Sequence, residues 1–124
     1  MTVQLDHTII PARDKKESAS FLAEILGLAE PEPMGPFMAV QVGHDLSLDF
    51  ADTDGDIRPL HYAFRVADDE FDTIFGRILE RSLPYWADPF RSRPNEVADR
   101  GNGRAFYFED PNGHFFEVLT RVRA

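Results

Sequence analysis

Two histidines and two carboxylates lie in segments of the sequence that otherwise read as apolar strands. His7 lies in LDHTIIPA, His61 in PLHYAFRV, Asp49 in LSLDFAD and Glu117 in HFFEVLT. A carboxylate buried in such a strand without a partner destabilises the fold, so each acid must either face water or bind something. Imidazole and carboxylate groups together hold divalent iron, manganese, nickel or zinc. The four residues are therefore candidates for a metal site.

An internal repeat relates these four residues to one another. One offset aligns His7 with His61, and a larger offset aligns Asp49 with Glu117, the extra residues being absorbed by a polar loop over 87–103. Pairing the two Gly-His dipeptides instead would require a slightly different offset. We prefer the alignment that pairs acid with acid as well as histidine with histidine.

Hydrophobic periodicity and turn residues predict the same order of elements in both halves. The first half reads as a strand over 5–12, a helix over 14–28, a turn-rich connector PEPMGP, and a hairpin of strands over 37–43 and 46–52. The second half reads as a strand over 59–66, a helix over 68–82, a long loop and a hairpin within 103–120. The sequence therefore predicts an α+β fold.

Alternation along the predicted strands sorts their side chains onto two faces. The apolar face, which should pack under the helices, collects Ile10, Leu48, Phe50, Tyr62, Phe64, Phe116 and Val118. The opposite face collects the two histidines and the two acids beside small residues such as Ser47, Ala51 and Ala63. We expect this second face to line a cavity that carries the polar residues.

Ordinary structural roles are the alternative interpretation of these residues. Glu117 could pair with Arg65 or Arg121 instead of a metal, and Asp49 could be solvated. His114 falls in the predicted turn DPNGH, where exposed polar residues are common. The matching of residue types across the repeat favours the metal site over these alternatives.

The loop WADPFRSRPNEVADRGNGR and the hairpin that follows it supply candidate substrate-binding residues. Arg91 and Arg93 offer guanidinium groups that bind carboxylates and other anions. Trp86, Tyr107 and Phe115 are candidates for contacting an aromatic substrate. The alternative is that the arginines pair with nearby acids and that the aromatic rings serve packing.

Composition limits the classes of function. The chain has 124 residues, eleven Phe and no Cys, which suits one packed domain without disulfides or thiolate metal sites. A formal net charge of −9 repels phosphate backbones and argues against nucleic acid as a primary partner. No apolar run reaches membrane-spanning length and the start lacks a signal-peptide pattern, so the sequence predicts a cytoplasmic protein with no membrane partner.

The segments LDHTII, ILGL, HYAFRV and FYFEDPNGHFFEV resemble the vicinal oxygen chelate (VOC) superfamily, which includes glyoxalase I, extradiol dioxygenases and bleomycin-resistance proteins. The resemblance implies a single domain over 1–124 with two βαβββ modules, about 3–52 and about 58–121. The modules are expected to form a curved, cup-like mixed sheet with the helices on its outer face. The resemblance also implies a homodimer.

The resemblance further implies which residues act. His7, His61 and Glu117 stand where metal-dependent members place their ligands, so a divalent metal (Fe, Mn, Ni or Zn) is the expected cofactor. Asp49 stands where glyoxalase-like members have Glu, and it is a candidate general base beside the metal. Glu117 and Asp49 are thus the candidate catalytic residues.

The implied function is a metal-dependent enzyme that chelates a small oxygenated substrate and is of either dioxygenase or glyoxalase/isomerase type. The alternative is a non-catalytic protein that sequesters an antibiotic, as bleomycin-resistance proteins do.

Overall fold

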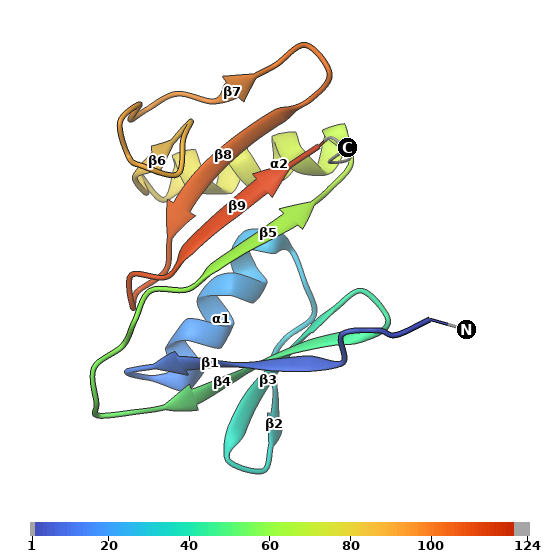
Figure 1. The fold of residues 1–124 in the computed structure, drawn as a ribbon, viewed down its shortest axis with the longest axis vertical. Coiled ribbons are helices and arrows are strands. Elements are labelled where there is room, and N and C mark those ends of the chain that lie inside the picture. Colours follow the sequence, from blue (N-terminus) through green and yellow to red (C-terminus); the bar gives the residue numbers. More distant parts are fainter. Residues whose placement is uncertain (1, 121–124) are drawn as a thin grey trace. The chain divides into compact units, whose positions relative to one another are not determined.

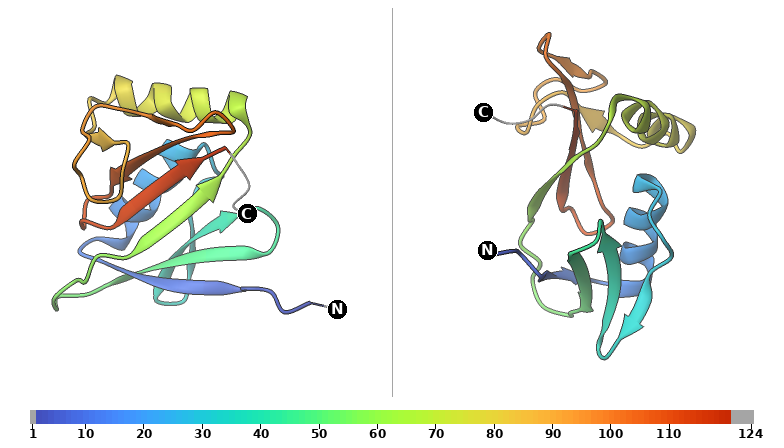
Figure 2. Two further views of the ribbon diagram at one scale, coloured as in Figure 1. Left: turned by 45° about the horizontal axis from the view of Figure 1, so that its top comes forward. Right: turned by 90° about the vertical axis from the view of Figure 1, so that its right-hand side faces the viewer.

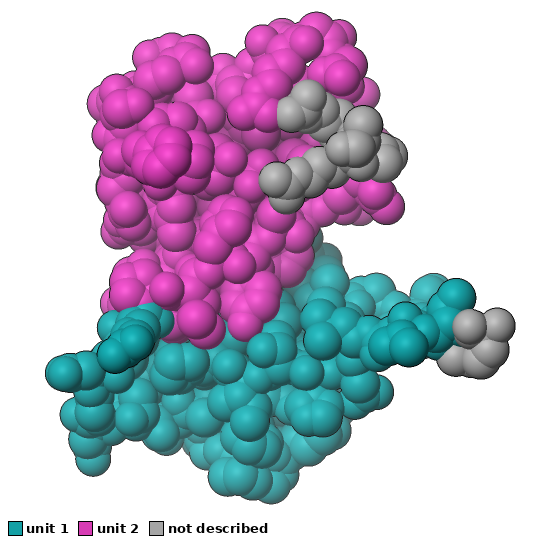
Figure 3. All heavy atoms as spheres, viewed as in Figure 1, with its two compact units in different colours: residues 1–58 teal, residues 59–124 magenta. Residues whose placement is uncertain are grey.

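The chain folds as two compact units, each built around one mixed sheet. The computed structural model describes residues 2–120. Unit 1 covers Met1–Arg58 and unit 2 covers Pro59–Ala124 (Figure 3). Within the described residues each unit has one helix, which follows its first strand (Figure 1). The predicted α+β fold with two modules is confirmed.

Unit 1 contains a four-stranded sheet and helix α1. Its elements are β1 (His7–Ala12), α1 (Lys15–Leu26), β2 (Glu32–Met34), β3 (Phe37–Val42) and β4 (Leu46–Asp52). The strand order is β1-β4-β3-β2, with β1 parallel to β4 and the other pairs antiparallel. The connector PEPMGP was predicted to be a turn, but part of it forms β2. Pro33 is tolerated there because β2 lies at the edge of the sheet.

Helix α1 begins and ends at the residues that the sequence indicates. The Asp14 carboxylate accepts hydrogen bonds from the backbone N–H of Lys16 at 3.0 Å and of Glu17 at 3.2 Å. Gly27 ends the helix with a left-handed φ of 71°. The buried face of α1 includes Leu22 and Ile25 and packs on the sheet of unit 1.

Unit 2 repeats this plan with additional short strands. Its elements are β5 (His61–Arg65), α2 (Asp68–Glu80), β6 (Tyr85–Trp86), β7 (Ala98–Asp99), β8 (Arg104–Glu109) and β9 (Phe115–Leu119). The strand order is β5-β9-β8-β6, and β7 pairs with β8. Helix α2 lies along one face of this sheet (Figure 2). Phe71 and Phe75 of α2 each place their rings 5.3 Å from the Phe106 ring.

The predicted apolar face forms most of the core of each sheet. Ile10, Leu48, Phe50, Phe116 and Val118 are buried. The two remaining members, Tyr62 and Phe64, are half-buried because β5 is an edge strand with a neighbour on one side.

The turn between β8 and β9 is closely hydrogen-bonded, and its end residues Asp110 and His114 are buried. The Asp110 carboxylate accepts from the backbone N–H of Asn112 and of His114, both at 2.9 Å. His114 Nδ1 accepts from the backbone N–H of Leu60 at 2.9 Å, which ties the turn to the start of β5. His114 is buried, unlike most polar turn residues, but it has the structural role that its place in a turn suggested, because its ring completes a backbone hydrogen bond inside unit 2.

No helix among residues 2–120 combines the length and apolar character needed to cross a membrane.

Candidate metal centre

Each unit places one histidine and one acid at equivalent positions of its sheet. In unit 1, His7 pairs with Ser47 of β4, which lies two positions before Asp49. In unit 2, His61 pairs with Phe115 of β9, which lies two positions before Glu117. The equal register bears out the alignment of the sequence repeat that pairs the two acids.

In unit 2, His61 and Glu117 present two potential ligand atoms to each other. His61 Nε2 lies 3.4 Å from Glu117 Oε1, and His61 Nδ1 lies 2.9 Å from the Phe115 carbonyl oxygen. A carbonyl only accepts, so Nδ1 carries a hydrogen and donates it. In the neutral ring the lone pair of Nε2 therefore faces a carboxylate oxygen, an arrangement that is repulsive unless a proton or a cation lies between them. Of the two alternative partners for Glu117, Arg121 lies outside the described residues.

The spacing of this pair fits two ligands of one metal ion. Metal bonds of about 2.0–2.2 Å place adjacent ligand atoms roughly 3.0–3.5 Å apart. The Glu117 side chain is 15% exposed and that of His61 is 48% exposed, so the pair is shielded on one side and accessible on the other. The Phe115 carbonyl fixes the tautomer and orientation of His61, as second-sphere acceptors do for metal-bound histidines.

Aromatic rings of unit 2 lie beside this pair. Tyr107 stacks on His61 with ring centroids 6.0 Å apart and an interplanar angle of 25°. It also stacks on Phe115 at 5.5 Å and 17°. Burial raises the pKa of the Tyr107 hydroxyl to about 12, and the charge of Glu117 and a hydrogen bond to its carboxylate act in the same direction. Tyr107 is therefore neutral at physiological pH.

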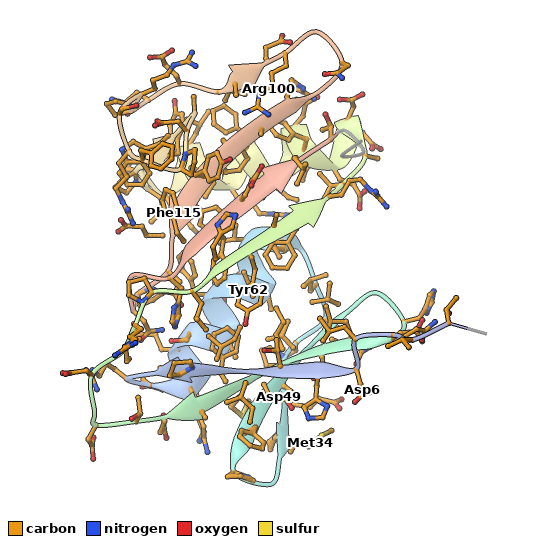
Figure 4. All side chains as sticks on the ribbon, in the orientation of Figure 1. Asp6, Met34, Asp49, Tyr62, Arg100 and Phe115 are labelled. Carbon is orange, nitrogen blue, oxygen red and sulfur yellow. The ribbon has the colours of Figure 1, made fainter. Side chains whose placement is uncertain are left out.

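The predicted substrate-binding residues fall into two places. Trp86, whose ring centroid lies 5.6 Å from that of Phe115, joins Tyr107 and Phe115 in one cluster (Phe115 is labelled in Figure 4). Arg91 joins the same cluster, since its guanidinium carbon lies 4.1 Å from the centroid of the Phe115 ring. Arg93 instead pairs with an acid of its own loop.

Both arginines already have acidic partners, as the alternative interpretation of the sequence expected. Arg91 Nε donates to Glu109 Oε1 at 2.7 Å, and one terminal guanidinium nitrogen lies at the same distance from that oxygen. Arg93 lies 3.0 Å from Glu96 Oε1. Neither guanidinium is available to an anionic substrate without giving up these contacts.

Asp88, which the sequence analysis did not single out, organises the loop that carries these arginines. Its carboxylate accepts from the hydroxyl of Ser92 at 2.6 Å and from the backbone N–H of Arg93 at 2.8 Å. The hydrogen bond from Ser92 lowers the pKa of Asp88. Phe90 is 85% exposed in this loop. An Asp followed by Pro, with Ser four residues later, was the available signal for such a turn.

In unit 1, His7 and Asp49 each have a polar neighbour that the sequence analysis missed. His7 Nδ1 lies 2.7 Å from Asp6 Oδ2, and this hydrogen bond raises the pKa of His7, aided by the negative charges of Asp6 and Asp49. Asp49 is buried, and its Oδ1 accepts from the hydroxyl of Ser47 at 2.6 Å. With Nδ1 engaged by Asp6, His7 has Nε2 available as a ligand atom.

A hollow of about 930 Å³ lies against His7 and Asp49 within unit 1, and its lining includes Asp6 and Met34. Asp6, Met34 and Asp49 are labelled in Figure 4. Its existence follows from small side chains on the sheet. Ala39 of β3 lies opposite Asp49, whereas Tyr107 of β8 lies opposite Glu117. Unit 1 is thus open where unit 2 is filled by aromatic rings.

Neither unit by itself gathers a complete ligand set within residues 2–120. No group of three or more His, Asp or Glu side chains of these residues is arranged to hold a metal ion. Unit 2 supplies the pair His61 and Glu117, and unit 1 supplies His7 beside Asp49.

Comparison with known proteins identifies the superfamily. No family model matches the chain. The solved structure of the oxidase ChaP-H1 is 57% identical, covers 98% of this chain and 98% of its own, and superposes with a TM-score of 0.95. The chain belongs to the vicinal oxygen chelate superfamily. Among curated VOC proteins, the glutathione transferase FosA of Serratia marcescens is 26% identical over 125 residues, covering 95% of this chain and 81% of FosA.

The VOC relatives differ in the reactions that their names describe. The metallothiol transferase FosB of Lysinibacillus sphaericus is 25% identical over 130 residues, covering 97% of this chain and 84% of FosB. One relative is thus called an oxidase and two are called transferases. Membership of the VOC superfamily therefore does not specify the reaction of this chain.

Proposed function

We propose that this chain is a divalent-metal-dependent VOC enzyme acting on a small oxygenated substrate that the metal chelates, with His7, His61 and Glu117 as ligands. The observation that carries the proposal is the 3.4 Å approach of His61 Nε2 to Glu117 Oε1, while His61 Nδ1 donates to a carbonyl. The name metallothiol transferase, borne by a curated relative, supports a metal in this fold.

The metal, when bound, acts as a Lewis acid that polarises a chelated oxygen of the substrate. Two imidazoles and one carboxylate suit iron, manganese, nickel or zinc and leave coordination positions for the substrate. The donor set does not select among these metals. The name oxidase, borne by a relative of 57% identity, favours an oxidative reaction over isomerisation.

The other residues of the chain orient groups and move protons. The Phe115 carbonyl keeps His61 in the tautomer that presents Nε2. The hollow of unit 1 offers space for the substrate beside Asp49. Ser47 occupies one carboxylate oxygen of Asp49, and the other oxygen is the candidate acceptor of a substrate proton.

Metal content tests this proposal directly. Wild-type protein supplied with metal and then desalted should retain a near-stoichiometric amount of one of the four metals. His7→Ala, His61→Ala and Glu117→Ala should each lose it, because each removes one of three ligands. His44→Ala is the matched control: His44 lines the hollow of unit 1 but is not a proposed ligand, so this variant should keep the metal.

Two results would contradict the proposal. A wild-type protein that stays metal-free after metal is supplied would exclude the site, and binding of aromatic antibiotics by that metal-free protein would point to sequestration. Equal retention of metal by all four variants would show that the metal binds elsewhere. If the metal is iron, consumption of dioxygen with a panel of catechols tests the oxidative reaction.

A further inference from the structure

We propose that Tyr107 is a positioning residue that holds both metal ligands of unit 2, an inference that rests on the proposed metal site. Tyr107 pairs directly with Glu117 in the β8–β9 ladder. Its ring also stacks on that of His61, with centroids 6.0 Å apart. One side chain therefore contacts both members of the ligand pair.

The ring of Tyr107 is held by its own neighbours. It is only 6% exposed, and its centroid lies 6.0 Å from that of the His61 ring and 5.5 Å from that of the Phe115 ring. Phe115 is in turn covered by Arg91 at 4.1 Å, and Glu109 holds the Arg91 guanidinium. This chain of contacts restricts rotation of Tyr107 and, through the stacked rings, of His61.

The hydroxyl of Tyr107 acts on the second ligand. It forms a hydrogen-bonding interaction with the Glu117 carboxylate, whose Oε1 lies 3.4 Å from His61 Nε2. Donation from a fixed hydroxyl restricts rotation of the carboxylate and so keeps its oxygens in register with the imidazole. Outer partners of this kind change metal affinity by roughly tenfold to a hundredfold when removed.

The repeat shows that this support is particular to unit 2. The position opposite Asp49 in unit 1 is Ala39, which has neither ring nor hydroxyl. Asp49 therefore has no facing ring, and its hydroxyl partner is Ser47 of its own strand. The difference agrees with Glu117, and not Asp49, serving as the acidic ligand.

Tyr107→Phe tests the inference because it removes the hydroxyl and keeps the ring stack. Affinity for Co²⁺ is measured by competition with a chelating indicator, and the visible absorption of the bound Co²⁺ reports its ligand geometry. Affinity should fall about tenfold or more and the Co²⁺ bands should shift. The thermal unfolding midpoint of the metal-free protein should stay unchanged.

Tyr85→Phe is the matched control. Tyr85 also lies in unit 2, but its ring packs on Phe75 of α2 at 5.0 Å, so this variant should bind Co²⁺ like the wild type. Arg91→Ala provides a second test that leaves the core intact. It uncovers Phe115, loosens the stack from outside, and should lower Co²⁺ affinity by a smaller factor than Tyr107→Phe.

The outcomes separate this inference from the proposed function. A wild-type protein that binds no Co²⁺ overturns the metal site and the role of Tyr107 with it. A wild-type protein that binds Co²⁺, with the same affinity and spectrum in Tyr107→Phe, overturns only the positioning role. A loss of affinity as large in Tyr85→Phe as in Tyr107→Phe would also overturn it.

Discussion

His7 stays protonated to a higher pH than an ordinary histidine. The hydrogen bond between its Nδ1 and the Asp6 carboxylate raises its pKa above the usual 6.5. A pKa raised by folding means that the contact stabilises the fold below the unfolded-state pKa. This contribution is lost as the pH rises through the higher folded-state value, where the proton leaves and Nε2 becomes able to bind metal.

Asp6→Asn should lower the pKa of His7 in the metal-free protein, because the amide replaces a charged acceptor by a neutral one. An NMR titration of the His7 ring protons measures this change. Asp45→Asn, which removes a charge elsewhere on the lining of the same hollow, should leave the titration of His7 close to that of the wild type. An equal pKa in wild type and Asp6→Asn would show that the contact with Asp6 does not set it.

Residue type and alternation alone placed His61 and Glu117 on one face, since both lie in strands whose period is known. They did not predict which atoms face each other, because the Phe115 carbonyl that orients His61 belongs to a neighbouring strand. Pairing of Arg91 with an acid was among the sequence alternatives, but the identity of that acid, Glu109, was not predicted. This pairing joins a loop to a strand, and the path of an irregular loop leaves no periodic signal.

At the scale of elements, the β8–β9 turn holds the strand that carries Glu117. Asp110 is buried and binds two backbone N–H groups of this turn. Asp110→Ala leaves those groups without their acceptor and should lower the free energy of unfolding by about 1–3 kcal/mol. Urea unfolding of the metal-free protein measures the change.

The β3–β4 turn supplies the control for this experiment. Asp45 lies there and is exposed, so Asp45→Ala should change the free energy of unfolding by no more than about 0.5 kcal/mol. Equal losses in the two variants would mean that the hydrogen bonds of Asp110 contribute nothing particular to stability.

The sequence predicted long elements well and short ones poorly. Helix α1 was recognisable because Asp14 and Gly27 mark its ends and apolar residues repeat between them. Strands β2 and β7 have three and two residues, which is too short for alternation to be visible. They form because a neighbouring strand offers an edge, which is a tertiary effect.

At the scale of the whole molecule, apolar residues around β1 predict a homodimer. Val3, Leu5 and Ile9 occupy every second position in step with His7, with polar residues between them. Each of the three is at least half exposed. Strand β1 is also an edge of its sheet. An exposed apolar row on an edge strand favours association. Sedimentation should give twice the 14.1 kDa chain mass.

Ile9→Glu should shift the protein toward the mass of a single chain, because a carboxylate would be buried in the contact. Leu79→Glu is the control: Leu79 is as exposed as Ile9 but lies on α2, so the dimer should persist. A wild-type monomer, or equal dissociation in both variants, would contradict the prediction. Mixing His7→Ala with Glu117→Ala then tells whether the proposed metal site lies within one chain or is shared between two subunits. Metal binding returns in the mixture only if the site is shared, because one subunit then supplies His7 and the other supplies Glu117.

In each unit the first strand pairs in parallel with the last, β1 with β4 and β5 with β9. This pairing determines when each sheet can close while the chain is being synthesised. β1 can join β4 only after Asp52 has been made, and β5 must wait for β9, which ends at Leu119. A ribosome adds roughly 5–20 residues per second, so several seconds separate the two closures. Unit 1, with His7 and its hollow, has all its strands while Glu117 is still untranslated. The proposed metal site can therefore be completed only after β9 has been made, when the strands of unit 1 are already available to fold.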